Sequence, residues 1–221
     1  MVRNIATKLS IASMGLFLLI LLGLHFLKPE YDPVWRFISE YALGKYGWLM
    51  SLDFFLVALS SFCFMIAAWD ETRSITGRIG QVLLGISALG MAVAAMFTTD
   101  PITTPAVEMT HSGKMHALGG QLNLTPLAVL FLSFSINKRK GWKQVRLPLG
   151  ITAILTLIAT IGFAASVAAA RGEFGPGTYA GLFGRLLMVG FGAWIIIAGV
   201  HMLRLQPQKY IRKGSNGCIK R

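Results

Sequence analysis

The acidic, histidine and serine side chains near the ends of apolar segments are the first candidates for chemistry in this sequence. Glu40, Asp100 and His116 are residue types that exchange protons in enzymes or bind metal ions. Ser39 precedes Glu40, so a serine nucleophile with a base and an orienting acid is an alternative arrangement. The sequence contains no Gly-x-Ser-x-Gly nucleophile elbow, however, and a helical serine commonly bonds its own backbone. We therefore take Glu40, Asp100 and His116 as candidate catalytic residues, with Ser39 as a possible fourth member of the set.

Histidine spacing gives little support for a metal or haem centre. His111 and His116 are five residues apart, about 140° around a helix, so they do not form the same-face pair of a zinc-binding helix. His25 and His116 remain as candidate metal ligands from different segments. Two haems in a helix bundle would need histidine pairs near both of its ends. Only His201 lies toward the end opposite His25, His111 and His116. No cofactor is predicted.

Two charged residues fall inside apolar segments, Asp53 and Arg185, each about six residues from a segment end. A charge within a membrane span is costly, so such residues usually face the bundle and find partners. We expect Asp53 and Arg185 to pair, or to join one polar cluster with His116, although Arg185 alone could extend to the surface. The expected cluster of structural polar residues comprises Asp32, Asp53, Arg185, Asn123 and His25.

Composition identifies the elements that must position these residues. Hydrophobic residues make up 54% of the chain and charged residues 14%, whereas soluble domains average about 25% charged. Apolar runs, continuous rather than alternating, have the length of membrane-spanning helices. These runs predict an all-α, polytopic membrane protein with one six-helix bundle in residues 1–205. The predicted spans are 10–27, 47–69, 79–98, 115–136, 147–170 and 179–203.

The connection between the first two spans predicts a short helix of its own, over about residues 33–43. Asp32 suits its N-cap, Pro33 its first position and Gly44 the turn after its end. Apolar side chains between them fall on one face, which is typical of a helix lying on a membrane surface. We expect this interfacial helix to cover the outer mouth of the bundle.

The distribution of basic residues predicts the orientation. Of 21 Lys and Arg residues, 15 fall in the two chain ends and the loops 70–78 and 137–146, and five in the alternate loops. The positive-inside rule then places both termini in the cytoplasm of a multi-pass protein of the plasma (inner) membrane. The net charge of +12 reflects these loops and a basic tail at 206–221, which we expect to be disordered. Without a basic face carrying interleaved aromatics, no nucleic-acid binding is predicted, and membrane lipid is the expected partner.

Several short motifs together resemble a known family. They are the segment KPEYDPVWRFISEYALGKYGWLM, the pair Asp100-Pro101 and the run Gly113-Lys114-Met115-His116. On these motifs the chain resembles the bacterial membrane family catalogued as domain of unknown function 998, over nearly its whole length and including six spans. The resemblance implies a fold and a location but no activity. It also implies that the family's recurrent polar set includes Asp32, Pro33, Ile38, Ser39, Glu40, Asp100, Gly113 and His116.

Three functional interpretations follow from these residues. We favour a polar cluster at the outer face that forms an interfacial site for a lipid or lipid-linked substrate, with Glu40, Asp100 and His116 as its acid–base or metal-binding groups. One alternative is an accessory or structural membrane protein without chemistry. The other is a small ion-coupled transporter that uses Asp53, Arg185 and His116, although no internal repeat of the kind common in transporters is found. Whether the protein is an enzyme is left open by the sequence.

Overall fold

A computed structural model describes the backbone of residues 1–215 and the side chains of residues 1–205. The described part is all-helical and contains no strand. Two short 3₁₀ helices, η1 (Ile38–Ala42) and η2 (Lys140–Val145), accompany seven α-helices. The α-helices are α1 (Val2–Leu27), α2 (Gly47–Ala68), α3 (Ile75–Met96), α4 (His111–Gln121), α5 (Thr125–Asn137), α6 (Arg146–Ala170) and α7 (Ala180–Ser215).

Six stretches are long and apolar enough to cross a membrane, which confirms the predicted number of spans. They are Val2–Leu27, Gly47–Ala68, Ile75–Met96, His111–Asn137, Lys140–Ala170 and Ala180–Leu205. The tail predicted at 206–221 therefore begins within α7, and its residues 216–221 lie outside the described part of the chain.

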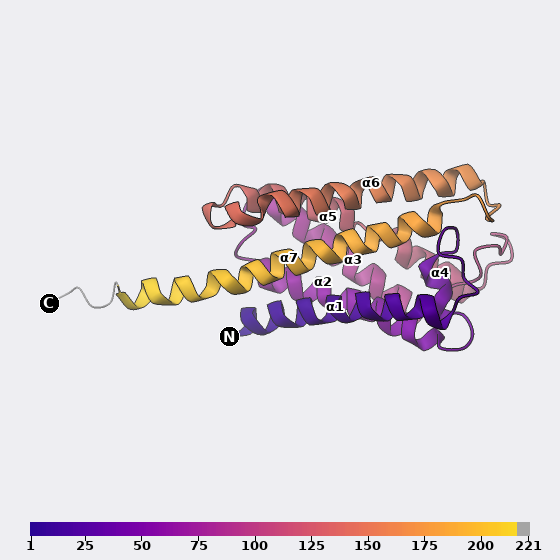
Figure 1. Cartoon of the computed structure of the whole chain (residues 1–221), viewed down its shortest axis with the longest axis horizontal. Helices are drawn as coiled ribbons and strands as arrows, with labels where there is room; N and C mark the ends of the chain where they lie inside the picture. The colour runs from indigo at the N-terminus through magenta and orange to yellow at the C-terminus, as the bar shows by residue number, and fades with distance from the viewer. Residues whose placement is uncertain (216–221) are drawn as a thin grey trace.

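The helices form one bundle in which α1 packs on α2 and α7, α3 on α2, α4 and α5, and α6 on α5 and α7 (Figure 1). The N-terminus and the far part of α7 lie toward one end, together with the connections 69–74 and 138–145. We call this the basic end. The connections 28–46, 97–110 and 171–179 lie at the other end, which we call the acidic end because it carries six of the nine Asp and Glu residues.

The core lies where α2, α5 and α7 meet. Trp194 of α7 is fully buried and packs edge-on against Phe64 of α2, with ring centroids 5.2 Å apart. Its indole Nε1 donates to Ser133 Oγ of α5 at 2.9 Å, so the polar atom of this large side chain is satisfied within the bundle. The Trp194 indole therefore fills the centre of the bundle, and its hydrogen bond to Ser133 fixes α7 relative to α5.

The fourth span is broken between α4 and α5. Pro126 lies in the first turn of α5, where its missing N–H would have had no helical partner. Asn123 Oδ1 accepts from both the N–H and the hydroxyl of Thr125, and Ser87 Oγ of α3 accepts from Leu124 N at 2.8 Å. These bonds satisfy backbone donors that an interrupted helix would otherwise expose to lipid. Asn123, expected in a cluster with Asp53 and Arg185, instead supports this break.

The helix predicted over about 33–43 is shorter than expected. Residues 33–36 form a turn, in which Asp32 Oδ1 accepts from Val34 N at 2.8 Å, and η1 follows only at Ile38–Ala42. A continuous helix does not form because its backbone groups bond elsewhere. Val34 O accepts from Leu182 N of α7 at 2.8 Å, and the Glu40 carboxylate accepts from Phe37 N. Residues 33–42, which we call the η1 segment, contact α2 and α7 and bury Glu40 and Tyr41. The segment therefore inserts between spans rather than lying flat upon them.

Candidate functional site

Asp100 fixes the end of the α3–α4 loop (residues 97–110). Its two carboxylate oxygens accept from the backbone N–H and the hydroxyl of Thr110, at 2.8 and 2.9 Å. Thr110 in turn caps α4, because its hydroxyl accepts from Gly113 N at 3.0 Å. A Cβ atom on Gly113 would overlap this carboxylate, lying 2.5 Å from its Cγ. Asp100 and Gly113, which belong to two of the sequence motifs, are thus in direct contact. A glycine is needed at position 113 because a side chain there would overlap the carboxylate.

His116 fixes the beginning of the same loop. It is buried in α4, and its Nδ1 lies 2.8 Å from Phe97 O and 3.1 Å from Ala94 O at the end of α3. Since carbonyl oxygens only accept, Nδ1 carries the proton and donates to them. The ring also packs edge-on against Phe54 of α2, with centroids 5.3 Å apart. His116 therefore caps α3 and joins it to α2 and α4.

Glu40 fixes the middle of the loop. Its Oε1 accepts from Ile102 N at 2.9 Å and pairs with the Arg36 guanidinium at 2.8 Å, while Oε2 accepts from Phe37 N at 3.1 Å. Burial raises the pKa of Glu40 above its usual value, against the opposing effect of these bonds and of Arg36 and Arg185. Ser39 beside it is also buried.

The three candidate catalytic residues thus converge on one loop but do not contact one another. Among the described residues, no hydrogen bond or ion pair joins Glu40, Asp100, His116 or Ser39 to another member of the set. Each of the first three instead satisfies backbone groups of the α3–α4 loop or of the helix ends beside it. This arrangement holds the loop in place.

Arg185 organises a second polar group at the acidic end. It donates from Nε to His25 Nε2 at 2.8 Å and from Nη2 to the Tyr41 hydroxyl at 2.9 Å. Its Nη1 donates to Arg36 O at 2.8 Å and to Gly181 O at 3.0 Å. Four bonds from one guanidinium tie α1, the η1 segment and α7 together. The carboxylate close enough to Arg185 to be affected by its charge is Glu40.

The pairing expected between Asp53 and Arg185 is not found, and His116 joins neither of them. The reason is the inserted η1 segment, whose carbonyl and hydroxyl groups occupy the Arg185 donors. Asp53, on α2, is fully buried, and neither of its carboxylate oxygens has a hydrogen-bond partner in the described structure. It lies six residues after Gly47, or roughly 9 Å along the helix at 1.5 Å per residue. Among the spans of the described structure it is the one acidic residue, and no hydrogen-bond partner is found for it there.

The two histidines proposed as metal ligands differ in how far hydrogen bonds engage their rings. His116 is bonded through Nδ1 alone, to Ala94 O and Phe97 O. His25 Nδ1 lies 2.7 Å from Leu21 O, and its Nε2 accepts from Arg185, so both ring nitrogens are in use. Across the described residues, no group of three His, Cys, Asp or Glu side chains is arranged to hold a metal ion. The geometry of His25 and His116 favours structural roles.

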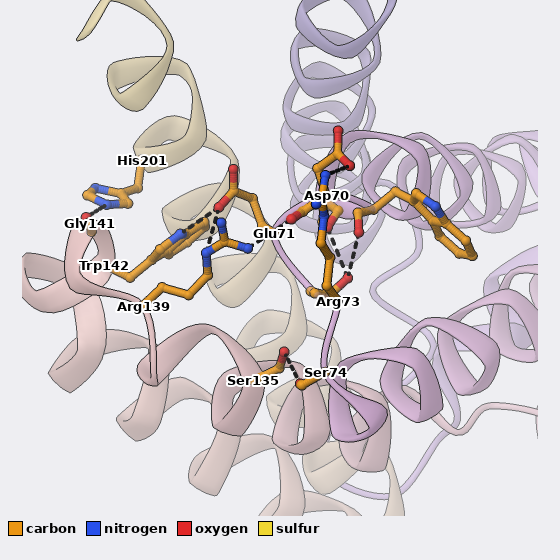
Figure 2. Close-up of polar contacts among 12 residues, drawn as sticks. Asp70, Glu71, Arg73, Ser74, Ser135, Arg139, Gly141, Trp142 and His201 are labelled. Carbon is orange, nitrogen blue, oxygen red and sulfur yellow. Dashed lines mark hydrogen bonds and ion pairs between the residues drawn. The ribbon is translucent and has the colours of Figure 1, made fainter. Parts of the chain in front are cut away.

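A buried ionic cluster at the basic end was not predicted (Figure 2). Glu71, 4% exposed, pairs with Arg3 at 3.1 Å and with Arg139 at 3.2 Å, and its Oε2 also accepts from Trp142 Nε1 at 3.4 Å. The His201 ring packs on Trp142, and its Nε2 lies 2.8 Å from Gly141 O. From the sequence, Arg3 and Arg139 count only among the basic residues that predict the orientation. The sequence feature that could have indicated this cluster is Glu71 itself, an acidic residue among loops that are otherwise rich in Lys and Arg.

The fold and these polar groups define a multi-pass membrane protein whose loops are fixed by buried side chains. The chain belongs to the family described as protein of unknown function (DUF998), whose family model matches residues 11–201. The match runs from α1 to α7 and includes all the polar groups described above except Arg3, which confirms the resemblance drawn from the motifs. Comparison with curated proteins and with solved structures finds no match.

Proposed function

We propose that this protein is a small proton-coupled carrier of the membrane and that Asp53 binds the coupled proton. The observation that carries the proposal is the complete burial of an Asp53 carboxyl group with no hydrogen-bond partner. A structural carboxyl group in this position would be a net cost to stability, since burying a polar group without a partner costs about 1–3 kcal/mol. Ionisable residues within spans commonly serve ion or proton pathways, which gives this cost a function.

Two features near Asp53 support a carrier rather than a static bundle. Phe54, the next residue along α2, packs on His116 at the outer half of the broken fourth span. Discontinuous helices recur in secondary transporters, where they border the transported ion or substrate. At the acidic end, where α2 begins six residues before Asp53, Arg185 donates to the Tyr41 hydroxyl and lies close enough to Glu40 to affect its pKa. In this proposal these contacts open to let a proton reach bulk water.

The cluster at the acidic end fits this proposal as a closed gate rather than as a catalytic centre. Glu40, Asp100 and His116 hold the α3–α4 loop over this end of the bundle, and Arg185 holds the η1 segment. We further propose that the acidic end faces outward from the plasma (inner) membrane, with both termini cytoplasmic. The support for this orientation is the concentration of Lys and Arg at the basic end.

Infrared difference spectroscopy of the purified protein tests proton binding by Asp53. We expect the wild type to show a carboxylic C=O band that disappears at high pH, and Asp53→Asn to lack this band. Glu173→Gln, in which an exposed carboxylate of the α6–α7 connection is neutralised, should retain it. Asp53→Glu should restore a band at a shifted frequency.

Two results would overturn the proposal. The first is a band that persists at every pH at which the protein stays folded, because Asp53 would then never release its proton. The second is a set of spectra identical for the wild type and Asp53→Asn. Either result favours the alternative of an accessory membrane protein without transport.

A further inference from the structure

A shallow groove lies at the basic end, where α3 begins. We call it the arginine groove. It has a volume of about 390 Å³ and is lined by Arg73, Arg78, Ile75, Ile79, Val82 and Leu83. We propose that the arginine groove binds an acidic phospholipid of the surrounding leaflet, with the phosphate at the two arginines and an acyl chain along α3.

The two guanidinium groups are held in place at the mouth of the groove. Arg78 stacks on the Trp69 ring, 3.7 Å from its centroid, and donates to Trp69 O at 3.2 Å. Arg73 donates to Asp70 Oδ1 at 2.8 Å, in a pair that is more than half exposed on both sides. Each of these bonds uses one of the five guanidinium N–H groups, so donors remain on both arginines for phosphate oxygens.

The apolar part of the groove continues from the arginines toward the hydrocarbon. Ile75, Ile79 and Val82 follow the i, i+4, i+7 pattern of one helix face, and they are 82%, 41% and 63% exposed. This stripe is roughly 10 Å long at 1.5 Å per residue. Trp69 lies beside its start, as aromatic side chains do at the headgroup level of a bilayer. A chain that begins at the arginines and continues over this stripe matches the layout of a phospholipid.

Charge selects an acidic lipid over a zwitterionic one. The lining of the groove contributes two arginines. A zwitterionic lipid offers the same acyl chain but no net charge to meet these side chains. Figure 2 shows Asp70 and Arg73 on the opposite side of the α2–α3 turn from the Glu71 side chain, which points toward Arg139 and Trp142. The turn therefore presents arginine outward while its glutamate holds the bundle together.

Lipid titration of the full-length protein in a neutral detergent tests this site. The probes are phosphatidylglycerol and phosphatidylcholine with identical acyl chains, and the readout is the lipid-bound fraction by native mass spectrometry. We expect Arg73→Gln/Arg78→Gln to raise the apparent dissociation constant for phosphatidylglycerol by at least about tenfold. The matched control, Lys140→Gln/Lys143→Gln, removes the same charge from exposed side chains at the same end and should change it by less than about twofold.

A second variant keeps the proposal testable if the double arginine variant does not fold. Ile79→Trp fills the apolar part of the groove and leaves both arginines, so we expect it to weaken phosphatidylglycerol binding as well. Equal losses in the arginine and lysine variants would show binding by diffuse surface charge and overturn the site. So would equal affinity for phosphatidylcholine, or competition by inorganic phosphate as effective as that by the lipid.

Discussion

Gly113→Ala should destabilise the protein through one identifiable contact, the carboxylate of Asp100. The added Cβ would lie 2.5 Å from Asp100 Cγ, so the carboxylate must move. It cannot move without loss, because Thr110 N and Thr110 Oγ1 hold its two oxygens at 2.8 and 2.9 Å. The α4 N-cap would then lose the group that orients its threonine.

The size of the effect follows from those two bonds. A hydrogen bond to a charged group contributes about 1.5–3 kcal/mol when buried. Because Asp100 is only half-buried, we take about 1 kcal/mol for each bond and about 2 kcal/mol for both. Alanine in a helix recovers about 0.7 kcal/mol relative to glycine. The net loss expected for Gly113→Ala is therefore about 1.3 kcal/mol in the free energy of unfolding.

A double-mutant cycle separates this contact from a general effect of alanine. In an Asp100→Ala background only a Cβ atom remains, 3.2 Å from the new methyl group, and Gly113→Ala should become neutral or stabilising. The coupling energy should be about 2 kcal/mol. Gly120→Ala in the same helix is the control, since a Cβ there has no neighbour within 4 Å.

The measurement is the free energy of unfolding in mixed micelles, from denaturing-detergent titrations of all the variants in the cycle. The reasoning fails if Gly113→Ala behaves like Gly120→Ala in the wild type. It also fails if the loss caused by Gly113→Ala persists unchanged after Asp100 is removed.

Two further perturbations probe the acidic end. Because burial raises the pKa of Glu40 above 4.5, the folded protein binds this proton more tightly than the unfolded chain does, so stability should fall as the pH rises above that value. Glu40→Gln should flatten the dependence of the melting temperature on pH in this range, and an unchanged slope would exclude Glu40 as its source. Gly181→Ala places a Cβ 2.8 Å from Pro33 O and 2.9 Å from Trp35 C, and should cost about 2 kcal/mol in the same micelle titration. Gly184→Ala, where the nearest atoms lie 3.7 Å away, should be neutral or slightly stabilising, so equal losses at both glycines would contradict the close approach.

The sequence was sufficient to predict the all-helical bundle and its six spans. A continuous apolar run of this length must satisfy its backbone hydrogen bonds internally within lipid, and the α-helix is the structure that does so within one segment. The sequence also singled out Glu40, Asp100 and His116, which lie around one loop at the acidic end. Their partners could not be predicted. All three bond to backbone groups, whose positions depend on how the α3–α4 loop folds and leave no pattern in side-chain types.

Asp53 and Arg185 illustrate a different limit of sequence reasoning. Similar depth in two spans suggested that these opposite charges pair, but depth says nothing about direction around each helix. The η1 segment supplies neutral groups that satisfy the arginine, and the aspartate has no hydrogen-bond partner in the described structure. Glu71 was missed for a related reason, since its partners Arg139 and Trp142 lie about 70 residues away in another loop.

The bond from the last span to the first connection has a consequence for how the chain is made. Arg185 Nη1 reaches Arg36 O across 149 residues, and Leu182 N reaches Val34 O beside it. During synthesis the first connection is made before the five later spans. The two carbonyls and the Tyr41 hydroxyl therefore lack their α7 donors until the last of these spans has been made. These contacts of the acidic end therefore form only after α7 has been made, and a chain truncated before Ala180 would lack the helix that completes them.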